Sequence, residues 1–429
     1  MILRDPVHGL VSFESDEDAI VEALLGAREL QRLRHIRQLG LTSLVYPGAD
    51  HTRFAHAVGA AFVMTRFASR LRQEHGALPF WQRLTSEHAR EGVAAALLHD
   101  IGHGPFSHLF EEAFPDGPRH EAWTERILLD PATEVNQILC RVDPTLPTRV
   151  SELVHGRHRL TYLARTVSGT FDVDRCDYLL RDAHFTGVSY GRFDLDWLIR
   201  SLRLGAANEE AAPPLAIDGT RGMPAIESFI LARFFMFQQV YFHKASRASE
   251  WMLRSIMTRV RQLLLDGARL PALPRGIEDL ARRGDTSLDE YLKLDDARMW
   301  TALAGLCEVT DEPLRDLCQR LCQRRLFKTI ELYGPHGGKE ARERAREQVE
   351  DIARERGLAP ELYVGLDVTR LAAFDERDTS LSVALPGGKS ESPAHVSFLL
   401  RRLAGESLEQ VRLIVAPELR EAAREALRL

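Results

Sequence analysis

Three histidines and an aspartate fall within ten residues, in the segment from His99 to His108. His99 and Asp100 end an alanine- and leucine-rich helical pattern, which two glycines and a proline then break. Imidazole and carboxylate are both good ligands for a divalent metal, and adjacency lets both reach one ion. His103 lies one helical turn beyond His99, beside such an ion without having to bind it. The alternative is a helix C-terminus with solvent-facing polar residues, but this density of donors favours a metal site.

A second polar pattern lies further along the chain. Asp174, Tyr178 and Asp182 recur at every fourth position, so on a helix they form one polar stripe, while Leu179 and Leu180 indicate that other faces are buried. A solvated helix face is the alternative. Such a face would interleave lysine and glutamate, so three acceptors in line favour contact with a polar ligand.

The element before the histidine-rich segment adds a further donor. Arg53 and His56 are three residues apart in a helix that we expect to begin at Thr52, so both point to one face. Together the candidate metal ligands are His56, His99, Asp100 and Asp174, from three separate helices. A site of this kind leaves metal positions open for water and a phosphate oxygen, and the nearby histidines could act as general acid or base.

Composition limits the classes of function. The chain has 429 residues, and its 56 Lys plus Arg against 62 Asp plus Glu give a net charge of −6, which argues against a dedicated nucleic-acid coat. The basic run 31–35 leaves solvation and anion binding equally open. Five cysteines without a C-x-x-C pair are typical of free thiols in a cytoplasmic protein. We expect no signal peptide and no membrane-spanning segment.

The elements that must position these residues are expected to be mostly α-helical. The predicted fold is a helical bundle with a β-hairpin insertion at about 201–218 and a small C-terminal α+β lobe. Residues 1–330 are predicted as the bundle domain, and 331–429 as a charged helix plus the lobe. Apolar spacing predicts these helices: 16–39, from Thr52, from about Glu87, from His120, 223–266, 277–330, 338–356 and 417–427. Alternation predicts these strands: 10–13, 201–204, 215–218, 363–368, 395–400 and 411–415.

The order H…HD…D resembles that of the HD-domain phosphohydrolases. The segments DPVHG, QRLRHIRQLG, YPGADHTRFAHAVG, LLHDIGHGPFSH and DVDRCDYLLRD are similar to the dNTP triphosphohydrolase branch, the SAM-and-HD-domain dNTPases. Later segments, YFHK, RRLFK and HVSF, extend the resemblance over almost the whole chain. Because the similar motifs begin at the first residues, we expect an HD core without a SAM domain.

The resemblance implies a role for each matching position. The implied metal ligands are His56, His99, Asp100 and Asp174, and the ion is Fe, Mn, Mg, Ni or Zn. The implied catalytic residues are His103, His108, Glu111 and His120. The implied substrate contacts are Gln38, Arg53, Arg175, Tyr178, Asp182, Arg233, Tyr241 and Lys244. The chemistry agrees, since a triphosphate of about four negative charges requires cations and guanidinium groups pair well with phosphate oxygens.

The implied activity is hydrolysis of a deoxynucleoside triphosphate to the deoxynucleoside and inorganic triphosphate. An HD-type phosphodiesterase or nuclease, acting on nucleic acid or a cyclic nucleotide, is the alternative. A regulatory relic without activity ranks last, because all four candidate ligands are present. The resemblance also implies a homo-oligomer, dimer or tetramer.

A nucleotide activator is a further partner that the resemblance implies. Gln31 and Arg34 match positions that grip such a nucleotide, but Gly26 and Arg4 depart from the family's guanine-reading pattern. An unpaired guanine edge costs about 1–3 kcal/mol. We therefore expect that GTP is not an obligatory activator.

Overall fold

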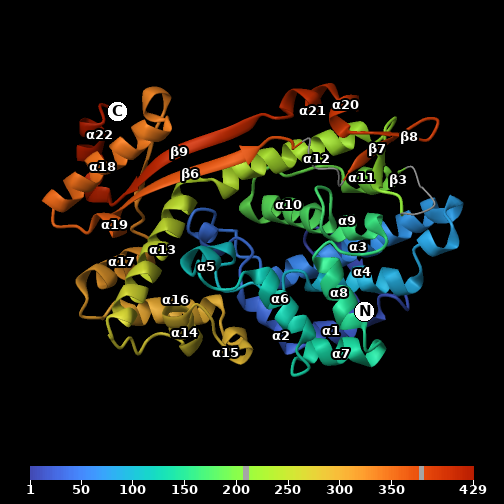
Figure 1. The fold of residues 1–429 in the computed structure, drawn as a ribbon, viewed down its shortest axis with the longest axis horizontal. Helices are drawn as coiled ribbons and strands as arrows, with labels where there is room; N and C mark the ends of the chain where they lie inside the picture. Colours follow the sequence, from blue (N-terminus) through green and yellow to red (C-terminus); the bar gives the residue numbers. More distant parts are fainter. Residues whose placement is uncertain (206–211, 376–380) are drawn as a thin grey trace.

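Helices make up most of the protein, which confirms the predicted fold class (Figure 1). The computed structural model describes residues 1–205, 212–375 and 381–429. Among these residues, no helix is both long enough and apolar enough to cross a membrane.

Three helices that position the candidate metal ligands lie together at the centre of the bundle. They are α3 (Arg53–Glu74), α4 (Ser86–Leu98) and α10 (Val173–Thr186), with α3 packed against both of the others. The first two begin close to their predicted positions. Thr52, Thr85 and Asp172 each accept a backbone N–H of the first turn of the helix that follows. The helix starts are therefore local properties of the sequence.

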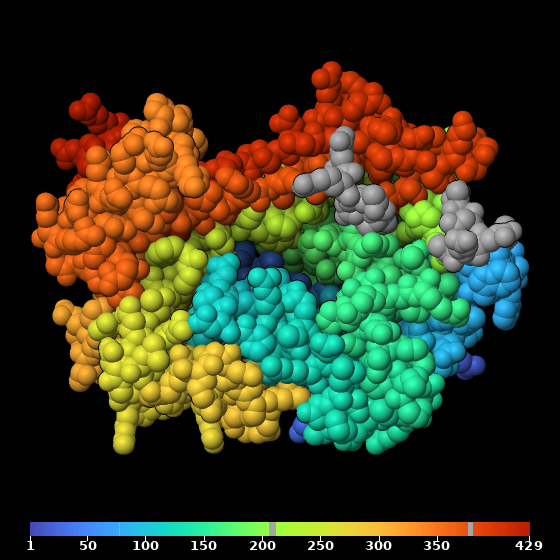
Figure 2. All heavy atoms as spheres, viewed as in Figure 1, coloured from blue at the N-terminus to red at the C-terminus, as the bar shows by residue number. Residues whose placement is uncertain are grey.

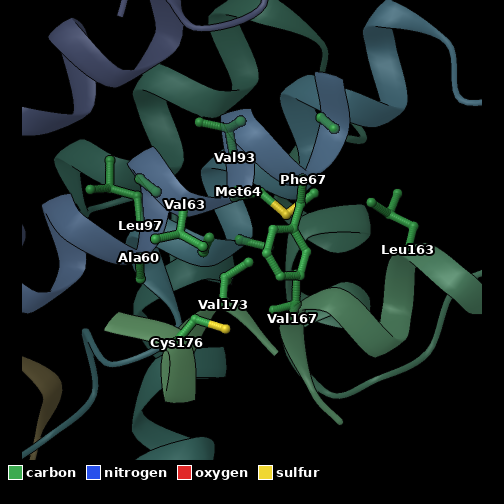
Figure 3. Close-up of a cluster of buried hydrophobic side chains, with 14 of the residues drawn as sticks. Ala60, Val63, Met64, Phe67, Val93, Leu97, Leu163, Val167, Val173 and Cys176 are labelled. Atoms are coloured by element: carbon green, nitrogen blue, oxygen red, sulfur yellow. The ribbon is translucent and has the colours of Figure 1, made fainter. Parts of the chain in front are cut away.

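The packing between these helices is apolar and almost free of solvent. Figure 3 shows the side chains of α3 meeting those of α4, α10 and the neighbouring helix α9 (Thr161–Val167) in one cluster. Phe67 and Met64 are both fully buried there. At about 1.5–3 kcal/mol for each large side chain, this burial holds the helix ends in one place. The labelled members of the cluster are Ala60, Val63, Met64, Phe67, Val93, Leu97, Leu163, Val167, Val173 and Cys176.

Further helices complete the bundle and cover its ends. In the first half they are α1 (Ala19–Gly26), α2 (Arg28–Arg32), α5 (His108–Ala113), α6 (His120–Leu129), α7 (Glu134–Val142), α8 (Leu146–Val154) and α11 (Leu195–Arg200). In the second half they are α12 (Met223–Met236), α13 (Lys244–Leu265), α14 (Arg275–Arg283), α15 (Leu288–Leu292), α16 (Asp296–Leu306), α17 (Glu312–Cys322), α18 (Lys339–Glu355), α19 (Pro360–Tyr363), α20 (Pro393–Val396), α21 (Phe398–Leu403) and α22 (Arg420–Ala426).

The strands of the described residues form three small sheets. Their bounds are β1 (Ile2–Asp5), β2 (Gly9–Ser12), β3 (Leu202–Leu204), β4 (Leu215–Asp218), β5 (Lys328–Glu331), β6 (Val364–Ala372), β7 (Ser382–Leu385), β8 (Lys389–Glu391) and β9 (Ser407–Val415). The predicted hairpin is confirmed as β3 paired antiparallel to β4, and 206–211 of its loop lie outside the described residues. The sheet orders are β1-β2, β3-β4-β7-β8 and β5-β9-β6.

Four predicted elements are wrong in detail. The helix expected over 277–330 is four separate helices, α14 to α17, followed by strand β5 from Lys328. In place of the helix expected over 16–39, the structure has two helices. α1 ends at Gly26 and α2 follows it, because the backbone of Ala27 between them is extended. The helix expected over 223–266 is two helices, separated by a π-helical segment, Phe237–Tyr241, and by extended His243. The strand expected over 395–400 is helical, because Ser397 accepts the N–H of Leu400 (3.0 Å) and caps α21.

The charged helix expected over 338–356 is confirmed as α18. Its buried face consists of Ala345, Val349 and Ala353, and it packs against β6 and α22 at one end of the molecule (Figure 1). Only its outer face is therefore left for solvent or a partner. The domain boundary at residue 330 stays a prediction.

Candidate metal and nucleotide site

Most of the predicted site residues line one cavity of about 540 Å³. Figure 2 shows a hollow in the middle of one face, with N-terminal atoms at its floor. The predicted residues that line the cavity are Gln38, Arg53, His99, Asp100, His103, His108, His120, Asp174, Arg175, Tyr178, Asp182 and Tyr241. His56 and Glu111 lie behind this lining, bonded to side chains of the site. Arg233 and Lys244 are not among the lining residues, and Lys244 is exposed.

The four candidate metal ligands converge at the floor of the cavity. His56 Nε2 lies 3.0 Å from Asp174 Oδ1, 3.3 Å from His99 Nε2 and 3.6 Å from Asp100 Oδ2. His99 Nε2 lies 3.4 Å from both Asp100 Oδ1 and Asp174 Oδ1. The structure thus brings together side chains from α3, from the end of α4 and from α10.

The histidine tautomers in this group suit a metal. His99 Nδ1–H donates to the carbonyl of Ala96 (2.8 Å), and His56 Nδ1–H donates to Asp177 Oδ2 (2.7 Å). Both Nε2 atoms therefore face the carboxylates, and in the neutral rings they can give their lone pairs to a cation placed between them. Burial alone would lower the pKa of His56, but Asp174 and Asp177 raise it to about 10, so this site attracts positive charge. The donor set fits a divalent ion such as Fe, Mn or Zn.

Arg53 joins the metal group to the next segment of the chain. Its guanidinium pairs with Asp100 Oδ2, and its Nε donates to Ser107 Oγ (2.8 Å). Arg53 holds the pKa of Asp100 well below its ordinary value against the raising effect of burial. Phe106 and Ser107 both have positive φ, 57° and 61°, and this sharp bend positions the start of α5.

A second polar cluster lies beside the metal group. It contains the four predicted catalytic residues, His103, His108, Glu111 and His120, which come from the bend after α4 and from α5 and α6. His120 Nδ1–H donates to Glu111 Oε1 (2.5 Å), and the rings of His103 and His120 stack with centroids 4.0 Å apart. Stacked rings cannot both point a nitrogen at one ion, so this geometry suits proton transfer better than a second metal. Burial and the charge of Arg53 hold the pKa of His103 well below its ordinary value, which keeps that ring neutral.

The polar stripe on α10 faces the same cavity. Asp182 is almost fully buried, and its two oxygens accept from Tyr241 Oη (2.7 Å) and His51 Nε2 (2.7 Å). The Tyr178 ring lies between this pair and the metal group, 6.4 Å from the His56 ring and 6.3 Å from the Tyr241 ring. Burial raises the pKa of Tyr178, so its hydroxyl stays neutral. The stripe therefore presents an acceptor and a flat ring to a bound molecule.

The predicted phosphate-binding cations differ in their surroundings. Arg175 Nη1 pairs with Asp172 and donates to the carbonyl of Gly169 (2.5 Å), so its guanidinium is held at the cavity edge. Arg233 lies over the Phe237 ring, 5.3 Å from its centroid. Burial raises the pKa of Tyr178, and the charge of Arg233 opposes this effect.

Sequence reasoning missed several residues of the site. His51 donates to Asp182, and Asp177 accepts from His56. Both His51 and Asp177 lie inside motifs that the sequence analysis had singled out, but neither was predicted as a site residue. Asp177 was missed because it lies three positions after Asp174, off the stripe. Arg247 and Glu250 line the far wall of the cavity, where Arg247 pairs with Asp367 of β6 (2.8 Å). No local pattern links α13 to β6, so this wall could not be found from spacing.

Of the residues that resemble an activator site, Gln31 lies on α2 and Arg34 on the short 3-10 helix Leu33–His35 that follows it. Gln31 Nε2 donates to the carbonyl of Leu25 (2.5 Å), and Arg34 Nε donates to Gln31 Oε1 (2.7 Å). Arg34 also covers the Phe54 ring at 3.6 Å. Arg34 is exposed at the surface.

Two protein-family models match the part of the chain that holds most of the site residues. The family described as HD domain matches residues 53–182, a range that contains His56, His99, Asp100 and Asp174. The HD associated region matches residues 193–268.

Known proteins resemble this chain over most of its length. An uncharacterized protein of Bacillus subtilis, YwfO, is 35% identical over 87% of this chain and 81% of its own length. The deoxynucleoside triphosphate triphosphohydrolase SAMHD1 of Danio rerio is 25% identical over 77% of this chain. The chain spans only 55% of the length of that enzyme.

Solved structures have the same fold. A phosphohydrolase from Bacteroides thetaiotaomicron superposes with a TM-score of 0.80 at 29% identity, covering 97% of this chain and 99% of the other. A hypothetical protein from Aquifex aeolicus superposes with a TM-score of 0.75 at 28% identity, covering 100% of this chain and 99% of the other.

Proposed function

The chain belongs to the HD domain family of metal-dependent phosphohydrolases, and we propose that it hydrolyses deoxynucleoside triphosphates to deoxynucleoside and inorganic triphosphate. The observation that carries this proposal is the meeting of three groups in one cavity: a metal-type donor set, a histidine cluster and the Tyr178–Asp182 stripe. The similarity to SAMHD1 enzymes supports the substrate class.

A nucleotide fits the arrangement of charge along the cavity. Arg53 and Arg175 lie at the end that holds the metal group, where a triphosphate would meet positive charge. Asp182 still has lone pairs free and would accept from a sugar hydroxyl. Gln38 Oε1 is buried with no partner in the described parts of the chain, so it offers a second acceptor to the sugar.

Each group of side chains would have a separate role in the proposed reaction. A divalent ion bound by His56, His99, Asp100 and Asp174 would polarise a phosphoryl oxygen and acidify a water. Arg53 would stabilise charge that develops on the phosphate oxygens. His120, oriented by Glu111, would give a proton to the departing 5′-oxygen, directly or through His108.

The bond that breaks can be identified directly. With dGTP as substrate in ¹⁸O-labelled water, we expect deoxyguanosine and triphosphate, with the label in the triphosphate, because the α-phosphorus is attacked. Ion chromatography and mass spectrometry of the products check this. The Asp174→Ala variant serves as the blank for contaminating phosphatases.

Other products would contradict the proposal. Orthophosphate or pyrophosphate as the first product indicates attack at another phosphorus. Hydrolysis of RNA or a cyclic nucleotide, with dNTPs left intact, would instead identify a phosphodiesterase or nuclease of the same family.

Tyr178 is expected to determine the preference for deoxyribose. Its ring packs beside the position proposed for the sugar, so a 2′-hydroxyl would collide with it, and a steric or polar mismatch of one hydroxyl is worth about 10²-fold. Tyr178→Ala should therefore raise kcat/KM for NTPs relative to dNTPs by about tenfold or more. Tyr178→Phe keeps the ring and should keep the preference. Tyr190→Ala, at a half-exposed tyrosine outside the cavity lining, is the matched control; an unchanged ratio in Tyr178→Ala would refute the assignment.

A further inference from the structure

The DPVHG motif at the start of the chain has no part in the proposed reaction. Neither Asp5 nor His8 is among the residues that line the cavity. The turn between β1 and β2 nevertheless carries both side chains into the interior. Asp5 Oδ1 accepts the N–H groups of Val7 and His8 (2.9 Å each), and this fixes the direction of the His8 ring.

His8 and Asp5 reach one buried carboxylate on α10. Asp177 Oδ1 accepts from His8 Nε2 (2.7 Å) and from Arg181 Nη2 (2.8 Å). Arg181 Nη1 in turn donates to Asp5 Oδ2 (2.8 Å). Asp177 and Arg181 are completely buried, so these bonds are shielded from water.

The same carboxylate holds a candidate metal ligand. Asp177 Oδ2 accepts from His56 Nδ1 (2.7 Å) and from Arg181 Nε (2.8 Å). Asp177 therefore receives four hydrogen bonds, two on each oxygen, and the guanidinium balances its charge. His56 Nδ1 has to carry the proton in this bond, so the neutral ring has its lone pair on Nε2.

A glycine in α3 makes room for this network. Gly59 follows His56 by three residues, so it lies on the same face of the helix. A Cβ at Gly59 would overlap both Asp177 Oδ1 and the Arg181 guanidinium. Only glycine allows the carboxylate and the guanidinium to approach the helix this closely.

We propose that the N-terminal turn, Asp177 and Arg181 form a positioning network for His56. The network selects the tautomer with Nε2 free and stops the ring from rotating away from the metal. Asp5 and His8 extend this support to the N-terminal hairpin, so a segment outside the cavity lining determines how well the ion is held. The inference rests on the metal site of the proposed function.

Metal affinity tests the network without any substrate. Mn²⁺ alone is titrated by calorimetry into metal-free full-length protein. Loss of a residue that orients a metal-binding histidine typically weakens affinity by about 10–100-fold, and we expect this for Asp177→Asn. His8→Ala removes one of the four donors and should give a smaller loss, which His8→Gln, with an amide donor, should partly restore.

A second histidine provides the matched control. His155 also makes one hydrogen bond, from Nδ1 to the carbonyl of Ser151 (2.7 Å), and is not among the cavity-lining residues. His155→Ala should bind Mn²⁺ like the wild type. At saturating Mn²⁺ the His8→Ala variant should regain most of the wild-type rate of dNTP hydrolysis, because the substitution affects only how His56 is oriented toward the ion.

Each outcome decides the question. Wild-type Mn²⁺ affinity in Asp177→Asn, or in His8→Ala if Asp177→Asn does not fold, overturns the proposal. Lack of Mn²⁺ binding by the wild type also overturns it. Because the titration contains no nucleotide, failure to hydrolyse dNTPs would overturn the proposed function and leave this result standing.

Discussion

Replacing Asp100 with alanine is expected to abolish metal binding and to lower the rate of dNTP hydrolysis by about 10³-fold or more. Asp100 supplies a carboxylate to the donor set, and the ion contributes several kcal/mol of transition-state stabilisation. Elemental analysis of the purified protein and initial rates with dGTP measure the two effects. Metal at the wild-type level in Asp100→Ala would contradict the assignment.

Asp100→Ala also leaves the Arg53 guanidinium without its carboxylate. Arg53 is 3% exposed, and a buried charge without its partner costs about 3–5 kcal/mol of stability. Asp174→Ala separates this effect from metal loss, because Asp174 pairs only with His56 and His99 among the described ion pairs. Asp174→Ala should lose metal and activity with a smaller fall in Tm.

An aspartate outside the site is the control for both variants. Asp311 caps α17 and pairs with Arg259 (2.6 Å), and it is not among the residues that line the cavity. Asp311→Asn should keep bound metal and activity at the wild-type level.

Removing the charge of Glu111 is expected to lower kcat by about 10²–10⁴-fold while bound metal is retained. Glu111 Oε1 accepts a hydrogen bond from His120 Nδ1 and so fixes the direction of the His120 ring. The His120 hydrogen bond holds the pKa of Glu111 below its ordinary value against the raising effect of burial, so the carboxylate is charged at neutral pH. Glu111→Gln keeps the volume and removes the charge, and single-turnover rates with dGTP measure the loss.

Two further variants test whether this effect comes from the Glu111–His120 pair. His120→Ala should lose as much activity as Glu111→Gln, and the double variant should lose little more, because the two residues act as a unit. Glu125→Gln, on α6 like His120 and outside the cavity lining, should have the wild-type rate. Independent, additive losses would show that Glu111 and His120 do not act together.

Part of the candidate site could be predicted from the spacing of residues along the sequence. Asp174, Tyr178 and Asp182 could be assigned to one face from their spacing alone, since 3.6 residues per turn place every fourth residue in line. The helix that carries Arg53 and His56 was predictable in the same way, from a capping threonine and an apolar repeat. The buried bonds of Asp177 were not, because His8 is 169 residues away in the chain.

Tertiary contacts decided the elements where local signals were weak. β7 was not predicted, and it pairs with β4, with Ala216 opposite Ser382. The residues around Ser397 have the β-branched and aromatic composition of a strand, but a serine cap and a proline at the start of α20 make them helical. A strand needs a partner that lies elsewhere in the chain, and its spacing cannot reveal which partner that is.

What the sequence determined by itself was therefore the set of reactive groups and the helix faces that carry them. Periodicity and capping act within about one turn, so helix starts and residues that share a face can be read from neighbouring residues. Only the tertiary structure decided which helix faces meet. It also decided that His56 and His99 point their Nε2 atoms at two carboxylates, and that Asp177 holds the His56 ring. These contacts depend on the packing of α3 against α4 and α10, which buries apolar surface drawn from distant parts of the chain.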